Sequence, residues 1–371
     1  MKVLQRAREL ELSGSKIVHM EVGEPDFPTA EPIVEAAHQA LARGFTSYSN
    51  AAGITPLREA IAGHYSALHG VAIEASRVFI TPGASGGLNL LSNLLVNPGD
   101  GILLSDPAYP CNRNFIRLAG GVPQLVPVDE HCGYQPTVAQ LEDRRDESSS
   151  GLWLASPANP SGTVIHRERL QELVSWAAQK QLHVVADEIY QGLHFVEDMP
   201  SLLELTTGGF VVNSFSKYYG MTGWRIGWIV VPQGYEQIVD TLSQNLFIAA
   251  STIAQHAAMA AFTPAAFEIF EARKLAFRER RDFLSKALAD IGFSIPHVTE
   301  GAFYLYAGID RFADNCEVFC QDLLEHHGVA ITPGTDFGDH RSRQNVRFAF
   351  TTSLQDLELG VDRLSKALAA A

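Results

Sequence analysis

Residues 210–231 have the sequence FVVNSFSKYYGMTGWRIGWIVV, in which two apolar runs flank a polar loop. Phe210–Asn213 and Trp224–Val231 are mostly apolar, interrupted only by Asn213, Arg225 and Gly227, which is typical of strands buried under helices on both faces. Similar short apolar runs precede them and alternate with amphipathic stretches. We expect further strands at residues 78–81, 102–104, 152–155 and 182–186, and helices through 88–95 and over 167–180. This order of elements predicts an α/β fold with a mostly parallel sheet covered by helices.

The last third of the chain has a different character. A long helical region with charge-rich faces covers residues 267–288 and could link two lobes. Beyond it, apolar runs predict strands at 302–306 and 345–350, with helices between and after them. The segment 144–151 (RRDESSSG) is expected to be a solvated loop.

The length of 371 residues is sufficient for a large and a small domain with a cleft between them. The central sheet belongs to a large domain, for which we predict residues 41–277. The two chain ends, residues 1–40 and 278–371, are predicted to form a smaller α/β domain.

Composition excludes several classes of function. The formal net charge of −14 leaves no surplus of Lys and Arg to neutralise phosphates, so a nucleic-acid partner is not expected. The four cysteines do not complete a zinc site, and free thiols are typical of a reducing compartment. Neither a signal peptide nor an apolar run of about 20 residues is found, so no membrane partner is expected and a cytoplasmic location is predicted.

The polar loop of the opening stretch combines groups that could bind an anion and a carbonyl together. Ser214, Ser216 and Arg225 could hold a phosphate through short and charge-assisted hydrogen bonds. Lys217 could condense with an aldehyde if its pKa is low enough to supply free amine. The alternative is a polar loop with a solvated lysine.

The run VVADEIY at residues 184–190 places a carboxylate at the carboxyl end of an apolar strand, the edge where ligands of open α/β sheets bind. A buried Asp187 needs a cation, and a protonated pyridine nitrogen could be one. Tyr190 could donate to the phenolate oxygen of the same ring. Capping of a following helix would also explain Asp187.

Three further segments follow or occupy apolar strands. The turn containing Gly83, Ala84 and Ser85 has small residues that let backbone N–H groups approach a phosphate at a helix N-terminus. Asn159 could donate to a phenolate oxygen or a carboxylate, although Asn-Pro also marks simple turns. Arg347 lies inside an apolar strand and needs an anion, which could be a substrate carboxylate or a structural salt bridge.

Taken in order, these segments resemble the class I/II aminotransferases of the fold-type I pyridoxal-phosphate superfamily almost end to end. The similar segments are VGEPDF at 22–27, Tyr48 to Arg58, NPSG at 159–162, DEIY at 187–190, SFSK at 214–217, GMTGWRIGW at 220–228, GAFY at 301–304 and PGTDFG at 333–338. The resemblance implies a mostly parallel, seven-stranded-type sheet, as in aspartate aminotransferases, and a second, smaller domain. It also implies a homodimer with composite sites.

The cofactor implied is pyridoxal 5′-phosphate, bound to Lys217 as a Schiff base. Lys217 would also move the proton between the substrate α-carbon and the cofactor. The other implied contacts are Asp187 to the pyridinium nitrogen, Tyr190 and Asn159 to the ring oxygen, Tyr109 to the ring face, Gly83, Ala84, Ser85, Ser214, Ser216 and Arg225 to the phosphate, and Tyr48 to the phosphate of the neighbouring subunit.

For the substrate, the resemblance implies that Arg347 and Asn159 bind the α-carboxylate, with the backbone of Gly23 close by. One aspartate-preferring bacterial branch has a lysine at the position of Ser85, and only Arg113 offers a nearby substitute. A neutral or broad L-amino donor is therefore expected, with a 2-oxo acid such as 2-oxoglutarate or pyruvate as acceptor.

Other activities remain open on the same scaffold, namely C–S β-lyase chemistry or a cyclase-like γ-elimination, because they share Lys217, Asp187 and Arg347. A transcription regulator with an aminotransferase-like domain is disfavoured, because no helix-turn-helix fits before Val22 and the charge is acidic. The chain begins inside what resembles the first helix of the family, so a short preceding segment that closes over the site in relatives is expected to be missing.

Overall fold

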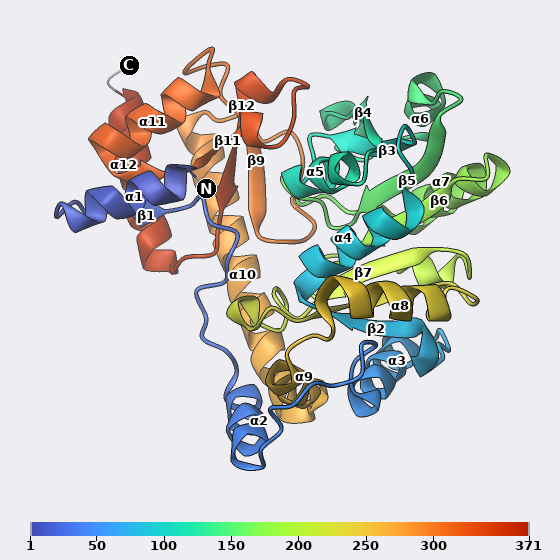
Figure 1. The fold of residues 1–371 in the computed structure, drawn as a ribbon. Helices are drawn as coiled ribbons and strands as arrows, with labels where there is room; N and C mark the ends of the chain where they lie inside the picture. Colours follow the sequence, from blue (N-terminus) through green and yellow to red (C-terminus); the bar gives the residue numbers. More distant parts are fainter. Residues whose placement is uncertain (1, 370–371) are drawn as a thin grey trace.

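A seven-stranded sheet forms the centre of the larger part of the molecule in the computed structural model, which describes residues 2–369 (Figure 1). Its strands are β2 (Val78–Thr81), β3 (Gly101–Asp106), β4 (Val122–Pro127), β5 (Ser149–Ala155), β6 (His183–Asp187), β7 (Phe210–Ser214) and β8 (Gly227–Val230). Their order in the sheet is β2-β8-β7-β6-β5-β3-β4. Only β8 runs antiparallel to its neighbours β2 and β7, which confirms the mostly parallel sheet.

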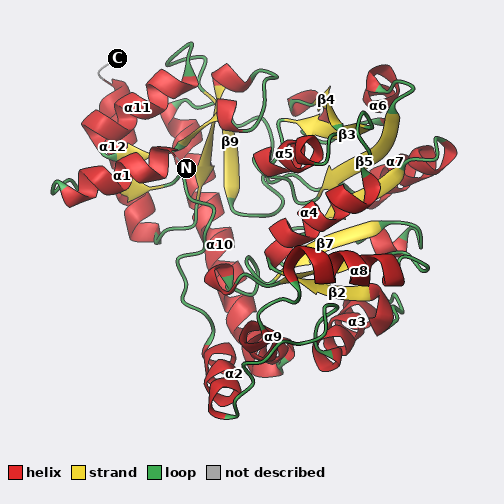
Figure 2. Ribbon diagram, viewed as in Figure 1, coloured by secondary structure: helices red, strands yellow, loops and turns green. Residues whose placement is uncertain are grey.

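Both faces of this sheet are covered, because alternate side chains of each strand point to opposite sides. Trp153, Val185 and Val212 pack with the leucines of helix α4 (Gly83–Leu95) on one face. Val184 and Val211, one position away, belong to the core on the other face, which includes α7 (Arg167–Gln179). The remaining helices of this part are α3 (Thr55–His69), α5 (Pro110–Leu118), α6 (Val138–Arg144), α8 (Glu236–Phe247) and α9 (Thr252–Met259) (Figure 2). The consecutive apolar residues in the strands are therefore explained by burial on both faces.

The chain ends meet in a second group of elements. Strands β9 (Tyr304–Gly308), β11 (Thr332–Pro333) and β12 (Asn345–Ala349) form an antiparallel sheet in the order β11-β12-β9, and β1 (Val18–His19) pairs in parallel with β10 (Val329–Ala330). Helices α1 (Lys2–Leu12), α11 (Cys316–His327) and α12 (Leu354–Ala369) lie around them in Figure 1. The long α10 (Pro264–Ile291) extends from this group to α2 (Glu31–Ala42), which also packs against α9. The domain bounds 1–40, 41–277 and 278–371 stay a prediction.

Three local expectations need correction. The strand expected from Trp224 begins at Gly227, because residues 222–224 form a 3-10 turn and Arg225 adopts left-handed backbone angles (φ 53°). The expected loop 144–151 becomes strand at Ser149, where pairing with Gly101 of β3 satisfies its backbone. The strand expected from residue 302 begins at Tyr304, after Ala302 in another left-handed conformation (φ 58°).

Among residues 2–369, no helix is long and apolar enough to cross a membrane. The same residues contain no group of His, Cys, Asp and Glu side chains arranged to hold a metal ion.

An ion pair attaches the segment after β1 to helix α10. The Arg280 guanidinium donates to both carboxylate oxygens of Asp26, at 2.8 and 3.0 Å, and to the carbonyl oxygen of Thr351 at 3.2 Å. Its other surfaces lie over the rings of Phe27 and Phe277, which makes this pair more enclosed than a surface salt bridge. It holds residues 22–27 against the rest of the protein.

Asp26→Ala should therefore lower the thermal unfolding midpoint, because it leaves a buried guanidinium without its counter-ion. The expected loss is about 1–3 kcal/mol, or a few degrees in the melting temperature. Asp143→Ala, which removes an exposed carboxylate from α6, provides the matched control and should leave the midpoint within about 1 °C of the wild type. Equal midpoints for the two variants would contradict a structural role for the ion pair.

Candidate active site

A cavity of about 310 Å³ opens at the carboxyl edge of the large sheet. In a parallel sheet the carboxyl ends of the strands meet at one edge, so residues distant in sequence come together there. The lining residues are Gly23, Ala84, Ser85, Leu88, Tyr109, Ala155, Pro157, Asn159, Asp187, Ile189, Tyr190, Lys217, Tyr304 and Arg347. Nine of the residues predicted from the sequence are among them.

Lys217 lies in the turn that follows β7, and its side chain extends across the cavity to the segment after β1. Its Nζ donates to the carbonyl oxygen of Gly23 at 2.5 Å and lies near the ring faces of Tyr190 and Phe303. Burial lowers the pKa of Lys217 below its ordinary value, and the positive charge of Arg347 acts in the same direction. The neutral amine, which is the nucleophilic form, is therefore favoured.

Asp187 is the last residue of β6, and its side chain is 5% exposed. Its carboxylate accepts one hydrogen bond, from the backbone N–H of Ile189 at 3.2 Å, and no described side chain donates to it. Burial raises the pKa of Asp187 to about 6, although the Ile189 hydrogen bond and Lys217 oppose the shift. A buried carboxylate with so little compensation suits a cationic ligand group.

The start of α4 forms a cradle for an anion. Pro82 precedes the helix without a side-chain cap, so the first N–H groups of the helix are available. Gly83 has a positive φ of 70°, and a Cβ added there would lie 2.6 Å from Nη2 of Arg225. A Cβ at Gly227 would lie 2.9 Å from the backbone nitrogen of Ala84. The two glycines therefore bring a helix N-terminus, an arginine and the start of β8 close together.

Ser214 and Ser216 do not line this cavity. The Ser214 hydroxyl donates toward Ser216 Oγ at 2.9 Å and accepts from the Ser216 backbone N–H at 3.0 Å. Arg225 donates to the carbonyl oxygen of Thr222 at 3.0 Å. The three residues surround the lysine turn, and their predicted contact with a phosphate stays a prediction.

Arg347 presents an unpaired charge to the cavity. Its guanidinium donates to Asn159 Oδ1 at 2.9 Å, to the Glu21 carbonyl oxygen at 2.6 Å and to Thr332 Oγ1 at 3.3 Å. No carboxylate of residues 2–369 forms a salt bridge with it, so the structural salt bridge that the sequence left open is absent from the described part of the chain. A bound carboxylate would be its counter-ion.

Of the three remaining residues named from the sequence, Tyr109, Tyr48 and Arg113, one lines the cavity and two do not. Tyr109 lines the cavity at the start of α5, and burial raises its pKa. Tyr48 is 83% exposed and does not line the cavity, so its predicted contact with a neighbouring subunit stays a prediction. Arg113 donates to the Asp336 carbonyl oxygen at 3.3 Å instead of entering the cavity.

Sequence reasoning missed Tyr304 as a site residue, although it lies in the segment GAFY used for the resemblance. Its hydroxyl lies 2.9 Å from that of Tyr190, and its ring lies 4.2 Å from the Arg347 guanidinium carbon. Its position depends on the pairing of β9 with β12, where Tyr306 rather than Tyr304 is directly opposite Arg347. Because side chains alternate along a strand, the sequence predicts which residues of β9 lie on the same face. It does not predict which ligand or side chains that face contacts.

These groups fit pyridoxal phosphate. The lysine with a lowered pKa suits an aldehyde, the sparsely paired Asp187 suits a pyridinium nitrogen, the uncapped start of α4 suits a phosphate, and Tyr109 offers a ring face.

Residues 15–364 match the family model described as aminotransferase class I and II. The chain belongs to this family. It is therefore an aminotransferase, of a family whose members generally depend on pyridoxal phosphate. The resemblance found in the sequence is confirmed.

Several relatives match this aminotransferase over nearly its whole length. It is 37% identical to the valine–pyruvate aminotransferase of Mycobacterium tuberculosis, over 98% of this chain and 94% of the relative. An aspartate aminotransferase of Streptomyces avermitilis is 34% identical, over 99% and 92%. The crystal structure of an aminotransferase from Mycobacterium tuberculosis matches with a TM-score of 0.96 and 36% identity, over 100% of this chain and 96% of that one. These names include both neutral and acidic amino donors.

Proposed function

We propose that this aminotransferase binds pyridoxal phosphate at Lys217 and moves the amino group of a neutral L-amino acid to a 2-oxo acid such as 2-oxoglutarate or pyruvate. When bound, the cofactor supplies an electron sink for the bond broken at the α-carbon. Arg347 and Asn159 bind the α-carboxylate and so orient that bond. The Lys217 amine accepts the proton from the substrate α-carbon and donates it to the cofactor carbon that takes up the amino group.

The observation that carries the proposal is the charge distribution in the cavity. Lys217 and Arg347 are the only cationic side chains among the described residues that line it. With Lys217 engaged by the cofactor, Arg347 can neutralise one carboxylate, and the described lining of the cavity offers no second cation for a distal one. Ser85 lines the cavity at the position where a lysine would serve that purpose, and Arg113 is bound to Asp336. A neutral side chain therefore suits the site better than aspartate.

The homodimer and the cytoplasmic location are also proposals. The segment around Tyr48 is fixed to α9, because Thr252 donates to the Ser47 carbonyl oxygen at 2.7 Å and Gln255 donates to Ser49 Oγ at 2.9 Å. An anchored segment with a largely exposed aromatic side chain supports a role for Tyr48 at the site of a second copy.

A half-reaction screen tests the proposed function. The protein loaded with pyridoxal phosphate is mixed with single amino acids, without an acceptor, while the visible absorption band of the cofactor is recorded. We expect alanine, valine, methionine or phenylalanine to convert the band to a pyridoxamine-type spectrum and a 2-oxo acid to restore it. The catalytic efficiency with these donors should be at least about tenfold higher than with aspartate. A tenfold difference corresponds to about 1.4 kcal/mol, which is the expected cost of placing the second carboxylate of aspartate without a counter-ion.

Two results would contradict the proposal in different ways. A catalytic efficiency for aspartate far above that for the neutral donors would overturn the specificity. A band that persists while pyruvate and ammonia accumulate would identify a lyase instead of a transaminase.

A further inference from the structure

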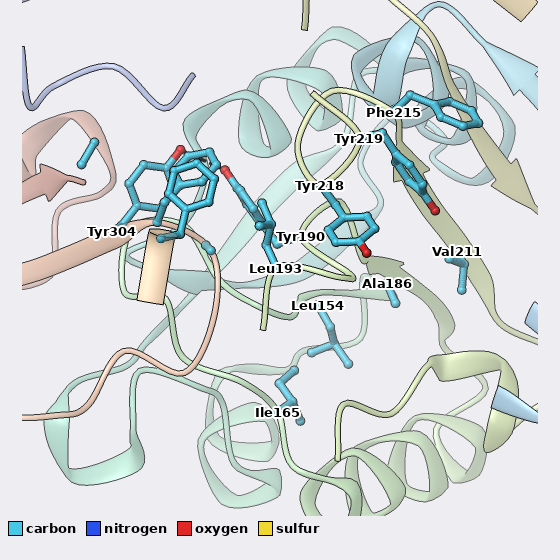
Figure 3. Close-up of a cluster of buried hydrophobic side chains, with 14 of the residues drawn as sticks. Leu154, Ile165, Ala186, Tyr190, Leu193, Val211, Phe215, Tyr218, Tyr219 and Tyr304 are labelled. Carbon is cyan, nitrogen blue, oxygen red and sulfur yellow. Dashed lines mark hydrogen bonds between the residues drawn. The ribbon is translucent and has the colours of Figure 1, made fainter. Parts of the chain in front are cut away.

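Two phenol groups meet inside the cavity. Tyr190 follows β6 and Tyr304 begins β9, and their hydroxyl oxygens are 2.9 Å apart (Figure 3). Both side chains are buried, with 4% and 2% of their surface exposed. The pair therefore links the large sheet to the smaller one at the cavity itself.

The position of Tyr304 is fixed from three sides. The Arg347 guanidinium lies over its ring, 4.2 Å from the centre, and the Tyr190 ring lies edge-on to it at 5.9 Å between centres. On the third side, a Cβ at Gly23 would overlap the Tyr304 hydroxyl, so the close approach requires a glycine there. Such enclosure leaves the hydroxyl little freedom to choose another partner.

A hydrogen bond between two hydroxyl groups uses the proton of only one of them. If Tyr190 donates its proton to the ring oxygen of the cofactor, its own oxygen must act as acceptor toward Tyr304. The proton of Tyr304 then points to Tyr190, and the two hydroxyls form a chain directed at the ring oxygen. Successive hydrogen bonds of this kind polarise and strengthen one another.

We propose that Tyr304 is a positioning residue that acts through Tyr190: its hydroxyl donates to Tyr190 and thereby strengthens the hydrogen bond from Tyr190 to the ring oxygen of pyridoxal phosphate. This inference rests on the proposed function, because it requires the cofactor at Lys217. The titratable and charged groups around the pair are Lys217 from the turn after β7, Arg347 from β12, Asp187 from β6 and Tyr109 before α5.

The test measures the pH midpoint at which the visible band of the bound cofactor changes. A donor to the ring oxygen stabilises negative charge there, which favours the form in which the cofactor–lysine nitrogen has lost its proton, and so lowers the midpoint. Tyr304→Phe should therefore raise the midpoint by about 0.3–1 pH unit, and Tyr190→Phe should raise it further.

The double variant separates an effect through Tyr190 from an independent one. In the Tyr190→Phe background, Tyr304→Phe should cause no additional shift, because the chain is already broken. Tyr306→Phe serves as the matched control, because it removes a buried hydroxyl without a partner among the described residues from the same strand. Its midpoint should equal that of the wild type, and thermal melts establish that each variant is folded.

An unchanged midpoint in Tyr304→Phe, or an equal shift with and without Tyr190, would overturn this inference alone. If the wild-type protein forms no visible band with pyridoxal phosphate, the proposed function fails, and the inference fails with it. The first pair of results leaves the proposed function intact, so the two failures are distinguishable.

Discussion

Lys217→Ala is expected to abolish transamination and the covalent attachment of the cofactor together. In the proposed function, the primary amine is both the group that condenses with an aldehyde and the base that moves the proton, so its removal should lower the rate by about 10⁴-fold or more. Reduction with borohydride followed by mass spectrometry should find the cofactor attached at residue 217 in the wild type and at no residue in the variant.

Two controls accompany this experiment. Lys217→Arg keeps a positive charge but offers no primary amine, and it should be as inactive as the alanine variant. Lys180→Ala removes a surface lysine that pairs with Glu142 and should change neither attachment nor rate. Cofactor that remains covalently bound in Lys217→Ala would assign its attachment to another lysine.

Asp187→Asn is expected to give the second largest loss of activity. The amide has nearly the same shape as the carboxylate but cannot neutralise a protonated pyridine nitrogen, so the ring becomes a weaker electron sink. We expect a decrease in kcat of about 10²- to 10³-fold, with a smaller change in KM because Arg347, the proposed partner of the substrate carboxylate, is unchanged. Asp187→Glu keeps the charge and should retain more activity than the amide; the reverse order would contradict the charge argument.

The same substitution should stabilise the protein when the cofactor is removed. Burial raises the pKa of Asp187 in the folded protein to about 6, above the ordinary aspartate value of about 3.8, so the folded state binds this proton more tightly than the unfolded state does. The resulting stability is fully present below about pH 3.8 and is lost as the pH rises through about 6, with a total of about 3 kcal/mol. Cofactor-free Asp187→Asn should therefore melt about 2–6 °C above the cofactor-free wild type at pH 8, and this advantage should vanish near pH 4.

Much of the fold could be predicted because burial on both faces leaves a direct signal in the strands. The mostly apolar runs at 152–155 and 210–213 lie within β5 and β7, and the run at 182–186 lies in β6 except for Leu182, which precedes it. The first and last residues of the strands were harder to predict, because they depend on which neighbouring strand supplies the hydrogen bonds. Ser149 is polar yet extends β5, because the neighbouring β3 supplies its hydrogen bonds.

The residues that line the cavity could be predicted from the sequence where they lie at the end of a strand, and not where their position depends on contact between distant segments. Asp187 and Lys217 each end or follow an apolar strand, so the topology of a parallel sheet brings them to one edge. Tyr190 and Tyr304 are 114 positions apart in the sequence, yet their hydroxyl groups are in contact. No local sequence pattern around either residue predicts that contact. The predicted role of Tyr48 cannot be examined within one chain, because it requires a second copy of the chain.

The residues that hydrogen-bond to Arg347 come from segments far apart in the sequence. This affects the order in which the site can form during synthesis on the ribosome. The arginine is held by the Glu21 carbonyl oxygen from the start of the chain, by Asn159 from the middle and by Thr332 close to the end. Because folding proceeds as the chain emerges, β6 with Asp187 and β7 with the Lys217 turn that follows it are complete more than a hundred residues before Arg347 is made. A nascent chain is therefore expected to assemble the lysine–aspartate half of the site well before it contains Arg347, the residue proposed to bind the substrate carboxylate.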